Sequence, residues 1–381
     1  EIIGPWNPGI KSTLPSNYLP LSTMFRPENV TTTYETVTEL SEFTGLPIQQ
    51  LVCFRAERLV VHELLIRVSA DIFFSDGSNY EDLGVNFRKV VGTILNNYIQ
   101  PHMAEIIHRF YEMQQQVKLA VDLELSRVLF AEPVIPSENE KTSRFKDFFR
   151  AKKKKRKLDC PESVELRDQR LIFLWQQKVE ASTDSMHQSI FRALVKIASA
   201  IVIKHGRLVG EKSLLSLLIT GLVCNEYGSE MMGEIISPYI NDAAIKEGYL
   251  ILPPQEEPII INVKGASASG KSTMRPLQKK HTEALGINWH DFALISPDIW
   301  RKYLLDYEAL GDAYKYAGTL AGDEVPIIDH KLDLYISPKA KQGKLSHLLV
   351  DRFRFDSFAA GSCAKEGSNL LTRFGHTIYM V

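Results

Sequence analysis

The chain has 381 residues, of which 44% are hydrophobic and 24% are charged, and its net charge is −1 at pH 7. This length allows two or three domains, and the near-zero charge excludes a global field that would attract nucleic acid or acidic lipid. The four cysteines are far apart and form no C-x-x-C pair, which indicates a reducing, cytoplasmic compartment.

The first third of the chain predicts an irregular arm followed by helices. Residues 1–32 are rich in Pro, Ser, Thr and Asn and show no periodicity. Residues 33–132 have a helical hydrophobic pattern, with a break near Pro101. We expect one helical face to carry Leu51, Phe54, Leu59, Val60, Leu64 and Val68.

A basic linker is expected over residues 133–163. It ends in the run Arg150-Ala-Lys-Lys-Lys-Lys-Arg-Lys157, with which no aromatic residue is interleaved. We interpret this run as a solvated linker. The alternatives are binding to nucleic acid or anionic lipid, or nuclear targeting if the cell is eukaryotic.

Residues 164–250 predict a second helical region. The longest apolar run, Leu214 to Cys224, is too short to cross a bilayer, so we expect no membrane span. The expected helices are 164–181, 184–205, 212–224 and 229–245.

Residues 251–381 alternate strands and helices, which predicts a mostly parallel α/β sheet with ligands at the carboxyl ends of its strands. The expected helices are 274–285 and 364–374. The expected strands are 258–264, 291–296, 345–350 and 376–381.

A complete Walker A motif follows the first of these strands. It reads Gly-Ala-Ser-Ala-Ser-Gly-Lys-Ser-Thr, from Gly265 to Thr273. Strand, small-residue loop and helix N-terminus together form an anion site, in which Lys271 reaches the β- and γ-phosphates and Ser272 binds Mg²⁺. The predicted cofactors are ATP or GTP with Mg²⁺, and the predicted nucleotide-binding residues are Gly265, Ser269, Gly270, Lys271, Ser272 and Thr273.

Two further acidic positions follow strands. Asp298 comes after the second strand and is a candidate general base, and Arg301, one helical turn later, is a candidate ligand of an acidic acceptor group. The alternative is that Asp298 only caps the next helix. Asp351 ends the third strand and is a candidate Mg²⁺ ligand, or else part of a strand-end turn.

The Walker A motif followed by Ser296-Pro-Asp298-Ile-Trp-Arg301-Lys-Tyr-Leu-Leu-Asp-Tyr307-Glu-Ala-Leu310 resembles the zeta-toxin family of P-loop kinases over residues 258–381. The resemblance implies a P-loop kinase-like domain, NTP-dependent phosphorylation of a small molecule such as a nucleotide sugar, and catalytic roles for Lys271, Asp298 and Arg301. Polynucleotide kinases also combine a P-loop with an Asp-x-x-Arg step, so the class of acceptor stays open.

The chain departs from the family pattern in two places. Ala268 replaces the glycine usual in the middle of the loop. The chain also ends at Val381, on a strand, where such kinases continue into an arginine-bearing lid. Either the lid lies beyond this sequence or arginines upstream, such as Arg354, replace it.

The sequence therefore supports two classes of function. The first is a phosphotransferase. The second is a nucleotide-binding interaction or regulatory protein whose helical region binds a protein partner. We expect that region to form a bundle of its own that restricts access to the phosphate site, or else to bind a partner independently.

Overall fold

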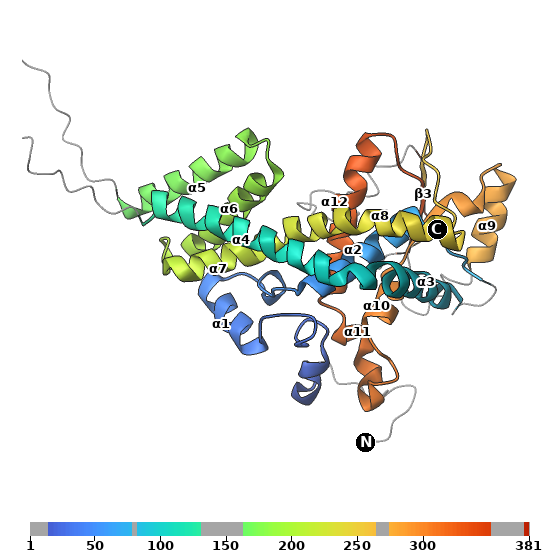
Figure 1. The fold of residues 1–381 in the computed structure, drawn as a ribbon, viewed down its shortest axis with the longest axis horizontal. Helices are drawn as coiled ribbons and strands as arrows, with labels where there is room; N and C mark the ends of the chain where they lie inside the picture. The colour runs from blue at the N-terminus through green and yellow to red at the C-terminus, as the bar shows by residue number, and fades with distance from the viewer. Residues whose placement is uncertain (1–13, 78–81, 131–162, 264–273, 352–376, 381) are drawn as a thin grey trace, which may run out of the picture. The chain divides into compact units, whose positions relative to one another are not determined.

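The computed structural model describes residues 14–77, 82–130, 163–263, 274–351 and 377–380. The sequence features outside these ranges are the Walker A residues Gly265, Ala268, Ser269, Gly270, Lys271, Ser272 and Thr273, the basic run 150–157, Arg354 and the expected helix 364–374. In the described part of the chain, neither Cys53 nor Cys224 forms a disulfide. The fold combines a large helical part with a small parallel sheet, as expected (Figure 1).

The chain forms two compact units, each made of separate stretches of sequence. One unit contains residues 1–38, 48–112 and 224–381, and the other contains residues 39–47 and 113–223. Helices from both expected helical regions therefore belong to the same unit as the sheet. Other helices of these two regions form a separate all-helical unit.

The all-helical unit consists mainly of the C-terminal part of α4 (Met103–Val128) with α5 (Val164–Ala181), α6 (Ser185–His205) and α7 (Lys212–Val223). The predicted bounds of these last three helices agree to within one residue, because their ends carry strong local signals. The side chain of Asp184 caps α6 by accepting from the His187 N–H at 2.9 Å. Gly206 ends that helix with a left-handed φ of 76°.

Helix α6 is long and apolar enough to cross a membrane by length and composition. This is weak evidence, because a core helix of a soluble protein passes the same test. Several of its apolar side chains are buried within the chain, among them Ile190, Leu194, Ile197 and Ile201.

The other unit is built around four parallel strands in the order β2-β3-β1-β4. The strands are β1 (Ile259–Val263), β2 (Phe292–Ile295), β3 (His347–Asp351) and β4 (Thr377–Met380). The described side chains of the first three are almost entirely buried, as expected for parallel strands covered on both faces. All four strands were predicted from the sequence.

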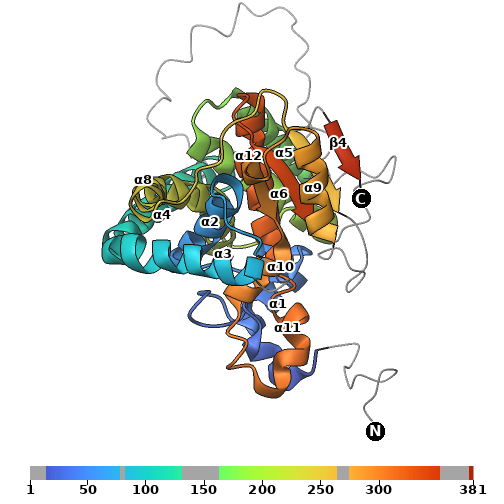
Figure 2. The same cartoon turned by 90° about the vertical axis from the view of Figure 1, so that its right-hand side faces the viewer.

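The helices of this unit are α2 (Ala56–Asp71), α3 (Asp82–Thr93), α8 (Ser229–Glu247), α9 (Arg275–Ala284), α10 (Pro297–Leu304), α11 (Ala317–Leu320) and α12 (Val325–Lys341). Helix α2 packs against α8, α12 and strand β2 (Figure 2). It is buried over most of its circumference, and the buried residues include the polar side chains of His62, Glu63, Arg67 and Ser69 as well as apolar ones. Helix α1 (Tyr34–Thr44) joins the two units.

The sequence misplaces the start of α2. Leu51 and Phe54 were expected on its apolar face, but the helix begins at Ala56. Both side chains are buried, so their apolar character is explained by packing outside the helix. The preceding backbone bonds to the N-terminal arm instead, since the Thr31 N–H donates to the Cys53 carbonyl at 2.9 Å.

Within the described residues, which begin at 14, the expected irregular arm contains a short helix and long-range contacts. Residues Ser16–Leu21 form a 3₁₀ helix, and the Thr23 N–H donates to the Leu320 carbonyl at 2.9 Å. Met24 is fully buried. The arm therefore packs on the segment around α11, a long-range contact that no local sequence pattern announces.

A buried polar network joins α2 to the start of α12 and to α8. Glu324 is fully buried and accepts hydrogen bonds from Arg58 Nε at 2.6 Å and Nη2 at 2.7 Å. His62, also fully buried, lies 2.6 Å from Glu324 through Nε2 and 3.1 Å from the Lys331 ammonium through Nδ1. The Lys331 ammonium can only donate a hydrogen bond, so His62 Nδ1 is the acceptor. The imidazole proton is therefore on Nε2, which donates a hydrogen bond to Glu324. His62 is therefore a neutral imidazole.

The pKa values of the network follow from this arrangement. Burial, followed by the Lys331 charge, lowers the pKa of His62 to about 4. Burial also lowers the pKa of Lys331 to about 8. Burial alone would raise the pKa of Glu324, but Arg58 and His62 outweigh it and hold that pKa below its usual range.

The network continues along α2 toward α8. Ser229 accepts from Lys331 at 2.8 Å and donates to Glu63 at 2.6 Å. Arg67 pairs with Glu63 and donates to Ser237 of α8 at 3.0 Å. The helices are thus joined by paired charges as well as by apolar packing, and removal of one partner would leave its neighbour charged and buried.

Candidate active site

Strands β1 and β3 end side by side. Val263, the last residue of β1, is the register partner of Asp351, the last residue of β3. After β1 the chain continues to β2, which lies on one side of the β1–β3 pair. After β3 it continues to β4, which lies on the other side of that pair. Connections that leave adjacent strands in opposite directions define a topological switch point, where ligands of parallel sheets bind. The Walker A sequence begins two residues after Val263, at Gly265.

Asp351 lies at this switch point and is partly exposed. Its carboxylate is suited to Mg²⁺, which prefers oxygen ligands and keeps several waters and phosphate oxygens. The other expected metal ligand, Ser272, lies outside the described residues. Within the described ranges, no group of three His, Cys, Asp or Glu side chains forms a metal site. A site made of one carboxylate, one hydroxyl and substrate phosphates would not form such a group.

Asp298 and Arg301 are brought together on α10, which begins directly after β2. Arg301 Nη1 donates to Asp298 Oδ1 at 2.7 Å. The Asp298 side chain is 63% exposed and that of Arg301 28%. Ser296 occupies the N-cap position, so Asp298 does not cap this helix. The ion pair orients the carboxylate while leaving it accessible to a substrate.

A buried hydrogen bond joins helix α10 to helix α2. Trp300, between Asp298 and Arg301, is fully buried, and its Nε1 donates to Ser69 Oγ at 2.9 Å. Ser69 is itself fully buried. An eight-residue helix has little stability of its own, so this contact and the packing on α3 and α12 fix its position. Neither the burial of Trp300 nor its partner Ser69 was predicted from the sequence.

Tyr307 lies within electrostatic range of the Asp298–Arg301 pair and of a second arginine, Arg88. The rings of Tyr307 and Tyr314 pack edge to face with centroids 5.5 Å apart. Burial raises the pKa of Tyr307, which also responds to the charges of Arg301, Asp298 and Arg88. Arg88 comes from α3, and no sequence motif pointed to it.

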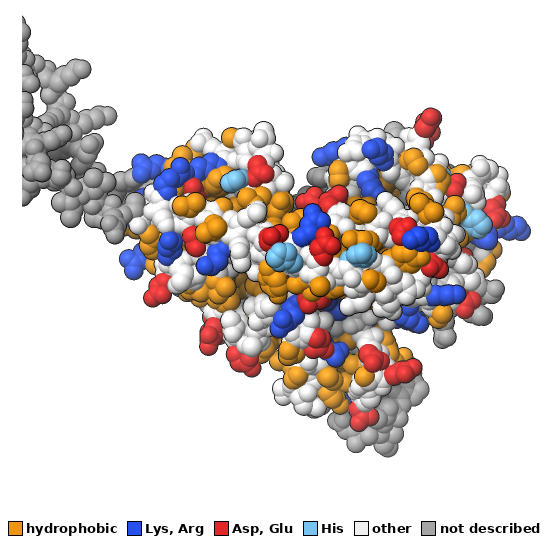
Figure 3. All heavy atoms as spheres, viewed as in Figure 1, with side chains coloured by type: hydrophobic (Ala, Val, Ile, Leu, Met, Phe, Trp, Pro, Cys, Tyr) orange, Lys and Arg blue, Asp and Glu red, His pale blue; other side chains and the backbone are white. Residues whose placement is uncertain are grey.

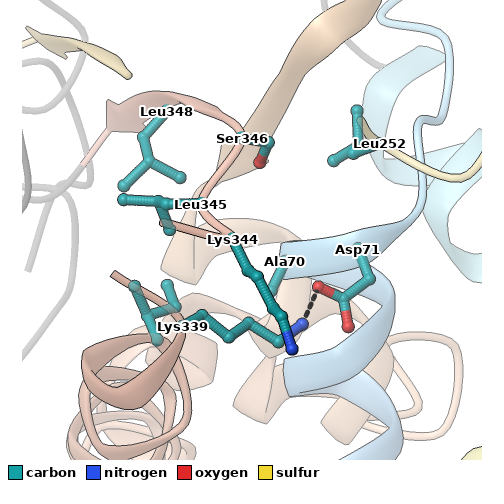
Figure 4. Close-up of a pocket in the computed structure, with 9 residues that line it drawn as sticks. Ala70, Asp71, Leu252, Lys339, Lys344, Leu345, Ser346 and Leu348 are labelled. Atoms are coloured by element: carbon teal, nitrogen blue, oxygen red, sulfur yellow. Dashed lines mark hydrogen bonds and ion pairs between the residues drawn. The ribbon is translucent and has the colours of Figure 1, made fainter. Parts of the chain in front are cut away.

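One small cavity lies at the opposite end of β3 (Figure 4). Its volume is about 20 Å³, and its lining includes Asp71, Lys339, Lys344 and Ser346. Lys339 pairs with Asp71, so its charge is already balanced. A space of this size holds about one water molecule. It also lies at the amino end of the strand, so we do not regard it as the substrate site.

Comparison with known proteins identifies no relative. No family model matches the chain, and neither the curated proteins nor the solved structures include a match.

Proposed function

We propose that the chain is a Mg²⁺-dependent phosphotransferase that uses ATP or GTP and resembles the zeta toxins. Its acceptor would be a hydroxyl of a small molecule such as a nucleotide sugar. The observation that carries this proposal is the position of the Walker A sequence. It directly follows β1, the strand that lies beside Asp351 at the topological switch point.

The proposed reaction assigns a role to each candidate residue. Gly265, Ser269, Gly270 and Thr273 shape and line the loop whose N–H groups bind phosphate oxygens. Lys271 balances charge on the β- and γ-phosphates. Ser272 and Asp351 would hold Mg²⁺, which would supply positive charge to offset the negative charge of the phosphates.

On the acceptor side, the hydroxyl oxygen attacks the γ-phosphorus. The bond between that phosphorus and the β–γ bridging oxygen breaks, and the nucleoside diphosphate leaves. Asp298 takes the proton of the hydroxyl. Arg301 orients Asp298 and binds an acidic group of the acceptor.

The first test is binding of Mg²⁺–ATP and Mg²⁺–GTP to the full chain by calorimetry. Lys271→Ala should abolish binding or weaken it strongly, because it removes the charge that faces the phosphates. Lys264→Ala, seven residues upstream and outside the motif, is the matched control and should bind like wild type. Equal affinity of wild type and Lys271→Ala would refute the proposed nucleotide site.

A second experiment distinguishes an enzyme from a nucleotide-binding interaction or regulatory protein. Transfer of labelled γ-phosphate is measured to a UDP-linked amino sugar and to an oligonucleotide with a free 5′-hydroxyl. Transfer to the sugar supports the zeta-toxin-like reading, and transfer to the oligonucleotide supports a polynucleotide kinase. Tight nucleotide binding without transfer to either favours a regulatory protein that acts through a protein partner.

A further inference from the structure

Arg88 of α3 lies beside α10, next to the candidate active site. The two helices pack together, and Gly84 lies one helical turn before Arg88 at their contact. A methyl group on Gly84 would lie 3.4 Å from Arg88 Nη1 and 3.9 Å from Lys302 Nζ. The guanidinium and the ammonium therefore occupy the same side of α3.

Arg88 is a partly buried cation on α3. The side chain is half-buried, yet none of the described carboxylates forms an ion pair with it. A partly buried guanidinium without a described carboxylate beside it favours an anion in that place. Arg88 thus resembles an anion-binding residue more than a structural one.

The packing of α3 on α10 brings Arg88 toward the helix that carries Asp298 and Arg301. The phenol of Tyr307 responds to Arg301, Asp298 and Arg88 together. Arg301 Nε is buried and has no acceptor among the described residues, although Nη1 is bonded to Asp298. Tyr314, packed on Tyr307, is 60% exposed and offers a ring edge or face to a ligand.

We propose that Arg88, with Arg301, forms the subsite that binds a phosphate group of the acceptor. This inference rests on the proposed function and adds to it a ligand class and a contribution from the helical region. A guanidinium presents paired donors that match phosphate oxygens. A phosphate bound there places the rest of the acceptor near the Asp298 carboxylate and the Tyr314 ring. Helix α3 then binds substrate directly.

The test uses the full chain saturated with Mg²⁺ and a non-hydrolysable ATP analogue, so that the Walker A site is filled. A UDP-linked amino sugar and inorganic pyrophosphate are titrated separately by calorimetry. Arg88→Gln should weaken binding of at least one probe by about 10-fold to 100-fold, as loss of a charge-assisted hydrogen bond does. Arg88→Lys should recover part of the lost affinity, because lysine keeps the positive charge but lacks the paired donors of the guanidinium.

Lys89→Gln is the matched control. It removes the same charge from the next residue of α3, which is exposed, and should bind both probes within about twofold of wild type. If both Gln variants weakened probe binding equally, the effect would come from general surface charge, and the proposed subsite would be overturned. No weakening in Arg88→Gln, or no binding of either probe to wild type, would overturn it as well.

Failure of this subsite can be told from failure of the proposed function. Binding of the ATP analogue is measured first in every variant, and it should be equal in wild type, Arg88→Gln and Lys89→Gln. If wild type does not bind the analogue, the proposed function fails. If it binds the analogue normally but Arg88→Gln binds the second probe like wild type, only the subsite fails.

Discussion

Trp300 donates a hydrogen bond to Ser69 across 231 residues of sequence, and both side chains are fully buried. This contact ties α10, which carries Asp298 and Arg301, to α2 of the first helical region. The N-terminal helices are therefore part of the body that holds the candidate active site. Deleting residues 1–250 would remove α2, so that truncation is not a clean test of whether the region restrains the enzyme.

Trp300→Phe should lower the free energy of unfolding by about 1–3 kcal/mol, because it leaves the Ser69 hydroxyl buried without its donor. Trp289→Phe is the matched control. Trp289 is equally buried, but its Nε1 has no acceptor among the described residues, so the same substitution removes an unsatisfied group. Urea unfolding of both variants checks the difference. Equal losses would show that the Trp300 hydrogen bond contributes nothing beyond ring volume.

Asp298→Asn should reduce phosphoryl transfer by about 10²–10⁴-fold while Mg²⁺–ATP affinity stays unchanged, since the amide cannot take the proton. The exposed position of Asp298 makes a folding defect unexpected. Steady-state kinetics and calorimetry on the same preparation separate the two effects. Wild-type turnover in this variant would move the role of the base elsewhere, and Asp351→Asn would then be the next variant to test.

His62 makes the unfolding free energy depend on pH. Its folded pKa, about 4, is below the ordinary value of 6.5, so the unfolded chain takes up the proton first. The stabilisation of the folded state that comes from neutral His62 is complete above pH 6.5, and it is lost as the pH falls toward 4. Between pH 7.5 and pH 5 we expect a loss of about 2 kcal/mol.

The measurement is urea unfolding of wild type and of His62→Gln across this range. The groups around His62 are Glu324, Lys331 and Arg58, which keep their charges over most of the interval. The His62→Gln profile should therefore be flatter by most of that loss. Parallel profiles for the two proteins would show that His62 is not the titrating group.

Glu324→Gln should cost about 3–5 kcal/mol of unfolding free energy, because it leaves Arg58 and Lys331 without their buried carboxylate. Glu234→Gln is the comparison. Glu234 also accepts from an arginine, Arg67, at 3.2 Å, but its side chain is 74% exposed. Its loss should be about 1 kcal/mol or less. Similar costs for the two variants would mean that burial does not set the strength of these pairs.

Much of the local structure could be predicted because its signals lie close together in sequence. Caps such as Asp184 and left-handed glycines such as Gly206 set helix ends, and continuous apolar runs indicated all four strands. The predicted start of α2 was wrong because Leu51 and Phe54 are buried although they precede the helix, and the Phe54 ring packs against His62. Helix α12 went unassigned, although it provides Lys331 for the buried network.

The sequence alone determined the Walker A motif, the strand before it and the placement of Asp298 and Arg301 one helical turn apart. Each of these depends on backbone geometry over a few residues. Only the tertiary structure decided that Val263 and Asp351 end side by side, that Ser69 holds Trp300 and that Arg88 lies beside α10. Those contacts join residues far apart in sequence. They are selected by the packing of whole helices and strands, which no local pattern specifies.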